Sequence, residues 1–150
     1  MRLKYFHHDF DKYNQFEIED MAFFHTMVTR MIEDVEIMVG FLAKRDDEPE
    51  VTEDLVREAL RVVDPVTITQ LADTSQVAIV NSQMVIDFAR PSLPHNEEAI
   101  ALISKYLNFR LIRMLYDAAE RADDEGLNKI KLRHYLPLCE EWPWPLNRWC

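Results

Sequence analysis

Apolar residues recur at spacings of three and four along most of the chain, the pattern of helices that bury one face. The longest such stretch predicts a helix over Glu17–Lys44, and a second predicts one over Asn96–Ala122. Shorter stretches predict a helix capped by Thr52 and another over Lys129–Leu138. The sequence therefore predicts an all-α fold.

The breaks between these stretches carry residues that end or start helices. Pro49 disfavours helix at the residue before it, and Asp64-Pro65 closes one helix and suits the first turn of the next. Gly126 follows the second long helix, where a left-handed residue often caps the end. These residues predict short connections between the long and short helices.

The segment 66–88 fits two structures. Its β-branched runs, Val66–Thr69 and Val77–Val80, suit a short β-hairpin turned at Asn81-Ser82. Val77, Val80, Met84, Val85 and Phe88 also fall on one helical face. We favour the helix and keep the hairpin as the alternative.

The order of elements occurs twice. Units over about 6–64 and 84–140 each contain a short segment, a long helix, an acidic break and a short helix, with a Trp/Pro-rich tail over 142–150. The two units align at an offset near 78 that drifts to 76, which places Glu19-Asp20 over Glu97-Glu98. Agreement in element order and length predicts an internal repeat.

Each unit resembles the histone fold. The junction Leu42–Arg45 through Val51–Leu60, where Val-Thr and two acidic residues precede an apolar helix, is similar to the end of that fold's long helix and its capped third helix. Ala118–Ala122 through Leu136 is similar in the second unit. The resemblance implies a histone doublet, in which two similar short-long-short units pack as a pseudodimer within one chain.

Composition suits a single domain over 1–150. The chain is 48% apolar, and its two Cys are too few for a disulfide framework. No apolar run approaches the roughly 18 residues of a membrane span, and the residues up to Asp9 do not resemble a secretion signal. We therefore expect no membrane association and a cytoplasmic protein, or a nuclear one in a eukaryote.

Charge separates this chain from DNA-binding histones. It has 17 Lys and Arg against 27 Asp and Glu, a net charge of −10. Residues 1–75 hold 8 basic and 17 acidic residues, whereas residues 76–150 hold 9 and 10. Because phosphate binding needs a cationic surface, we expect weak or no direct DNA binding and a protein partner with a basic surface.

The acidic turn after the first long helix and the tryptophans of the tail are the candidate partner-binding residues: Asp46, Asp47, Glu48, Glu50, Trp142, Trp144 and Trp149. Tryptophan is enriched at binding hot spots, although a tail that packs back on the domain is equally consistent with the sequence. Lys129, Lys131 and Arg133 are weak candidates for nucleic-acid contact.

No motif identifies a catalytic residue, a cofactor or a metal site. Neither His7-His8 nor the pair His134 and Cys139 has further ligands at a recognisable spacing, and metal binding by these residues is left open. We interpret His25 as a partly buried helical residue rather than a haem ligand. A metal- or haem-dependent helical enzyme is the least favoured reading.

The function that these observations favour is a non-enzymatic protein-interaction module with a histone-like fold, belonging to a complex associated with nucleic acid. The alternative is a small acidic inhibitor, immunity-type or DNA-mimic protein that blocks a basic nucleic-acid-binding partner. The sequence leaves homodimer formation open.

Overall fold

A computed structural model describes residues 17–71, 80–89 and 93–144, and confirms the all-α prediction. Its elements are β1 (Glu17–Ile18), α1 (Met21–Arg45), α2 (Glu53–Val63), α3 (Pro65–Gln70), α4 (Ser82–Ala89), α5 (Glu97–Asp124), β2 (Lys129–Ile130), α6 (Leu132–Tyr135) and a 3-10 helix over Leu136–Glu141. No helix within these residues is long and apolar enough to cross a bilayer.

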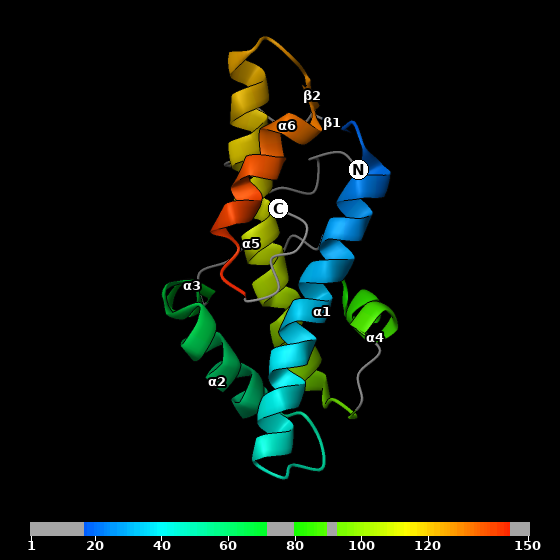
Figure 1. Cartoon of the computed structure of the whole chain (residues 1–150), viewed down its shortest axis with the longest axis vertical. Coiled ribbons are helices and arrows are strands. Elements are labelled where there is room, and N and C mark those ends of the chain that lie inside the picture. The colour runs from blue at the N-terminus through cyan, green and yellow to red at the C-terminus, as the bar shows by residue number, and fades with distance from the viewer. Residues whose placement is uncertain (1–16, 72–79, 90–92, 145–150) are drawn as a thin grey trace.

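The two long helices, α1 and α5, lie along the long axis of the molecule and run in opposite directions (Figure 1). Helices α2 and α4 flank them near one end, and α6 packs beside α5 near the other (Figure 1). The core is built from the inward apolar stripes of both long helices, including Phe24, Met31, Val35, Ile103, Leu107 and Leu111. The burial of these stripes explains why apolar periodicity located the long helices so well.

Helix α1 starts later than predicted because its first residues have other roles. Glu17 and Ile18 form a strand, and Asp20 is the N-cap, its carboxylate accepting a hydrogen bond from the Phe23 N–H at 3.0 Å. The first turn therefore contains no acidic residue. Asp20 acts on the helix by capping it, from just outside the first turn.

Both long helices end in the same kind of turn. Asp47 has φ 54° and Gly126 has φ 75°, so each adopts the left-handed conformation one residue beyond the C-cap. The following N–H groups reach back to helix carbonyls, Glu48 to Ala43 at 2.9 Å and Leu127 to Ala122 at 3.0 Å. This pattern is the Schellman motif, and it confirms the role predicted for Gly126.

The ambiguous segment is helical where it is described. Val66–Thr69 lies in α3, which starts at Pro65 with Asp64 as its cap, and Ser82 begins α4. The hairpin alternative is therefore wrong for these residues, and Val77–Ile79 lies outside the described residues. Tertiary packing against α2 and α5 decides the conformation over the β-branched composition.

The extended backbone that does form links the two halves of the chain. Strands β1 and β2 are parallel, with Glu17 opposite Lys129 and Ile18 opposite Ile130. At the other end of the molecule, Val51 forms a parallel bridge with His95. Each pairing joins the segment before one long helix to the segment after the other.

The two pairings lie at the spacing of the predicted repeat. Glu17 and His95 are 78 positions apart, and Val51 and Lys129 are also 78 positions apart. The long helices themselves differ in length, 25 residues in α1 and 28 in α5, so their N-caps are 76 positions apart and their C-caps 79. The offset thus rises from the N-caps to the C-caps of the long helices, whereas the sequence alignment has it falling from 78 to 76 along the chain.

Candidate functional site

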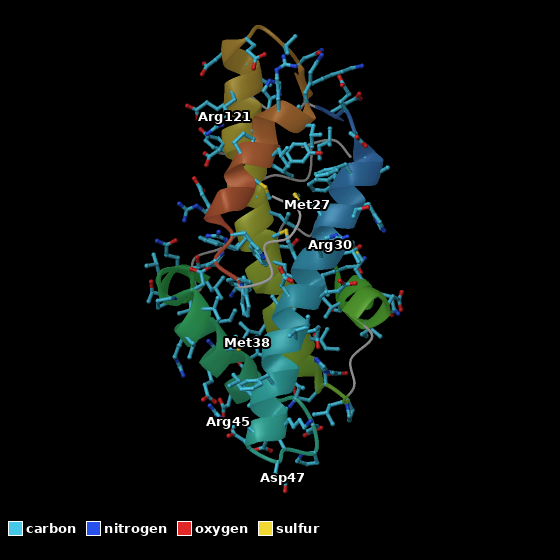
Figure 2. All side chains as sticks on the ribbon, in the orientation of Figure 1. Met27, Arg30, Met38, Arg45, Asp47 and Arg121 are labelled. Atoms are coloured by element: carbon cyan, nitrogen blue, oxygen red, sulfur yellow. The ribbon has the colours of Figure 1, made fainter. Side chains whose placement is uncertain are left out.

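Two acidic segments meet at the end of the molecule where α1 turns into α2. Residues 46–54 and 97–98 contain eight carboxylates and no Lys or Arg. The Val51–His95 bridge holds the segments together, with the Val51 N–H donating to Pro94 O at 2.8 Å and the Asn96 N–H to Val51 O at 3.1 Å. Asp47 projects at the tip, beyond Arg45 (Figure 2). We call these residues, 46–54 and 97–98, the acidic end.

Two carboxylates of the acidic end form ion pairs within the chain, Glu53 with Arg57 at 2.7 Å and Asp46 with Arg45. The Arg45 guanidinium donates to Asp46 Oδ1 at 2.7 Å and Oδ2 at 2.8 Å, and also to Glu58 Oε1 at 2.8 Å. The hydrogen bond from Arg45 lowers the pKa of Asp46, outweighing the opposing effect of desolvation. This pairing joins the end of α1 to the middle of α2.

The other predicted acidic residues remain open to solvent. Asp47, Glu48 and Glu50 are exposed, and no basic side chain of the described residues forms an ion pair with them. Glu97 and Glu98, in the first turn of α5, are exposed beside them. The helix N-termini of α2 and α5 partly offset this charge, since both helices begin within two residues of the bridge.

A buried ion pair, which the sequence did not predict, lies next to the acidic end. It links His95, the bridge partner of Val51, to Glu36 of α1. His95 Nε2 lies 2.8 Å from Glu36 Oε2, and His95 Nδ1 lies 2.9 Å from Leu93 O. The side chains are 3% and 8% exposed. Burial alone lowers the pKa of His95, but the Glu36 hydrogen bond, its charge and the Leu93 carbonyl together raise it. Both ring nitrogens face acceptors, so the geometry suits the protonated imidazolium.

The basic residues predicted to touch nucleic acid lie at the opposite end and are largely engaged. Lys131 Nζ lies 3.8 Å from Glu19, and Arg133 donates to Glu125 at 2.5 Å, while Lys129 is exposed. Hydrogen bonds from Arg133 and His134 lower the pKa of Glu125. Of the acidic residues at this turn, Glu125 contacts Arg133 and His134, while Asp123 and Asp124 are exposed.

Trp142 and Trp144, predicted as partner-binding residues, are buried, 5% and 1% exposed, which fits the alternative that the tail packs back on the domain. Trp142 Nε1 donates to Asp34 at 2.9 Å, and Trp144 Nε1 donates to the Tyr106 hydroxyl at 2.8 Å. Each indole N–H has an internal acceptor, which satisfies it without solvent. These residues pack back on the domain, and Trp149 lies outside the described residues.

The metal candidates do not converge in the described part of the chain, where no group of three His, Cys, Asp or Glu could hold an ion. His134 is buried, its Nδ1 accepting from the Lys131 N–H at 2.8 Å and its Nε2 lying 2.6 Å from Glu125. His25 is exposed rather than partly buried. His7, His8 and the Cys139 side chain lie outside the described residues.

Comparison with known proteins supplies no family. No model of a protein family matches the chain, and no curated protein is similar to it at a significant level.

Proposed function

We propose that this chain is a non-enzymatic protein-interaction module, a double histone-fold-like pseudodimer, which binds a basic protein partner through its acidic end. The observation that carries the proposal is the meeting of two acidic segments, from different halves of the chain, at one end of the molecule. Complementary charge at such a surface speeds association and sets specificity more than it adds affinity.

The exchanged pairings support the pseudodimer. The segment before α1 pairs with the segment after α5, and the segment before α5 pairs with the segment after α1. A two-fold exchange of this kind is what an intramolecular pair of similar units produces. The matched left-handed turns at Asp47 and Gly126 support it as well.

The acidic end favours a protein partner over nucleic acid. Its open carboxylates repel phosphates, and two of the three basic candidates at the other end already contact acidic groups. The alternative is an inhibitor that occupies a basic nucleic-acid-binding cleft, and the nature of the partner distinguishes it from an interaction module.

The first experiment measures binding of a lysine-rich synthetic peptide by fluorescence anisotropy across a salt series. One variant removes the charges of the acidic turn by the changes Asp46→Asn, Asp47→Asn, Glu48→Gln and Glu50→Gln. The matched control removes four exposed carboxylates elsewhere by the changes Asp87→Asn, Glu120→Gln, Asp123→Asn and Asp124→Asn.

Both variants change the net charge by the same amount, so long-range attraction to the peptide falls equally in both. We expect the acidic-turn variant to lose affinity and salt dependence well beyond the control. Equal losses in the two variants would mean that only net charge matters, and the proposed site would be rejected. Tight duplex binding in a low-salt gel shift would reject the preference for a protein partner.

A further inference from the structure

Next to the acidic end, three large apolar side chains lie exposed on neighbouring helices. Ile37 and Phe41 of α1 are 53% and 64% exposed, and Val62 of α2 is 69% exposed. At Gly40, between the two α1 residues, an added Cβ would meet nothing within 4 Å. We call Ile37, Phe41 and Val62 the apolar face.

The ion pair between Arg45 and Glu58 shows which sides of α1 and α2 face each other. Phe41 lies one turn before Arg45, and Val62 lies one turn after Glu58. Because the two helices run in opposite directions from their shared turn (Figure 1), Phe41 and Val62 both lie farther from that turn than the ion pair does.

The helices diverge beyond that pair (Figure 1), and Ile37, Phe41 and Val62 are all more than half exposed. Met38 and Arg45, which bracket Phe41 along the helix, lie on the side of α1 toward α2 (Figure 2). The apolar face therefore offers exposed side chains of both helices to an added helix.

The exposed carboxylates next to the apolar face determine which kind of partner helix can bind there. The acidic end begins at Asp46, directly after the last turn of α1, and Asp47, Glu48 and Glu50 are exposed there. A segment that lies along the face toward this turn would bring its end against open carboxylates. Lysine or arginine at that end would be attracted, and acidic residues would be repelled.

We propose that the apolar face and the acidic end form one docking surface for a basic amphipathic helix of a partner protein. The apolar side of that helix packs on Ile37, Phe41 and Val62, and its cations lie over Asp47, Glu48 and Glu50. This inference rests on the proposed function, because the acidic end supplies the charge half of the surface.

A second copy of the chain is the less suitable occupant. It carries the same net charge of −10 and the same open carboxylates beside its own apolar face. Repulsion between the two copies opposes self-association, whereas a cationic helix gains from the same carboxylates.

The test uses two labelled synthetic helices with leucine along one side, the first with lysine and the second with glutamate on the remaining positions. Fluorescence anisotropy measures their affinity for the full chain and for the variants Phe41→Glu, Phe41→Ala and Val62→Glu. Ile86→Glu on α4, where the side chain is 44% exposed, is the matched control.

We expect the lysine helix to bind the unmodified chain and the glutamate helix not to bind. Phe41→Glu and Val62→Glu each weaken the lysine helix by about tenfold, the effect of losing a well-packed interface residue. The added negative charge alone would strengthen this binding, so a loss can come only from the apolar contact. Ile86→Glu retains the affinity, and circular dichroism confirms the helix content of every variant.

Two results would overturn the inference and leave the proposed function intact. One is loss of binding in the acidic-turn variant with no change in the Phe41 and Val62 variants. The other is a dimer in sedimentation equilibrium that Phe41→Glu dissociates, because the occupant would then be a second copy. Loss of binding in the Phe41 variants but not in the acidic-turn variant would instead reject the proposed function, together with the requirement for a basic helix.

Discussion

The buried ion pair between Glu36 and His95 makes the stability of this protein depend on pH in a defined direction. The informative change is Glu36→Gln, which keeps the size of the side chain and an acceptor oxygen but removes the charge. His95 Nε2 lies 2.8 Å from Glu36 Oε2, so a glutamine oxygen at that position still accepts a hydrogen bond.

The cost of this change follows from the burial of both partners, which are 3% and 8% exposed. A hydrogen bond to a charged partner exceeds a neutral one by roughly 1–2 kcal/mol, and an imidazolium left without its counter-ion in a buried site adds to the loss. We expect the free energy of unfolding to fall by about 2 kcal/mol at about pH 5.5.

The sign of the pH dependence is set by the raised pKa of His95. Burial alone would lower this pKa from 6.5, and the interactions with Glu36 and Leu93 reverse that effect. The folded state therefore holds the proton more tightly than the unfolded state. The stabilisation from the ion pair is complete below about pH 6.5 and is lost as the pH rises through the folded-state pKa.

In Glu36→Gln the carboxylate is gone and burial favours the neutral ring, so the pKa of His95 falls. The difference in stability between the two proteins must then shrink from about pH 5.5 to about pH 8.5. Urea denaturation followed by circular dichroism measures the free energy of unfolding of each protein. Subtracting one value from the other cancels the contributions of the other histidines. Glu120→Gln, an exposed carboxylate, is the control and shows a constant difference. A Glu36→Gln difference that is constant or grows with pH would refute the reasoning.

Three further changes test other contacts. Tyr106→Phe removes the acceptor of Trp144 and the donor to Asp64, a 2.7 Å bond, so chemical denaturation should show a loss of about 2–4 kcal/mol and tryptophan emission should change. Thr52→Ala removes the cap of α2 and should cost about 1 kcal/mol by the same measurement. Asp47→Gly relieves a left-handed residue and should raise the free energy of unfolding by about 1 kcal/mol.

Periodicity and capping residues predicted the helices because both act within a few residues along the chain. Thr52 and Asn96 cap the helices as predicted, their side chains accepting from Leu55 and Ala99. The prediction failed at the start of α1, where Glu17 belongs to a strand that pairs with Lys129. A strand of two residues has no periodicity of its own, and its partner is set by how the two halves pack.

The acidic end could be predicted in part, since the turn at Asp46–Glu50 is a local charge run. The ion pair between Glu36 and His95 beside it could not be predicted. These residues are 59 positions apart, and the sequence around neither residue suggests the other as a partner. The inward packing of the tail had one signal in the sequence. Asp34 lies on the buried side of α1 beside Val35, and a buried carboxylate needs a hydrogen-bond donor in the core. Trp142 supplies one, and this contact decides that the tail packs inward.

The left-handed turn after α1 offers a way to separate folding from binding. Gly126 occupies the matching position after α5, so the fold itself is satisfied by glycine there, and an aspartate is the less stable choice. At the α5 end Glu125 is paired with Arg133, whereas Asp47 is exposed without a cation among the described residues. If the carboxylate serves binding, Asp47→Gly should raise stability and also weaken the lysine-rich peptide by about two- to fivefold, the effect of one exposed charge. Equal peptide affinity in the stabilised variant would show that Asp47 is no part of the binding surface.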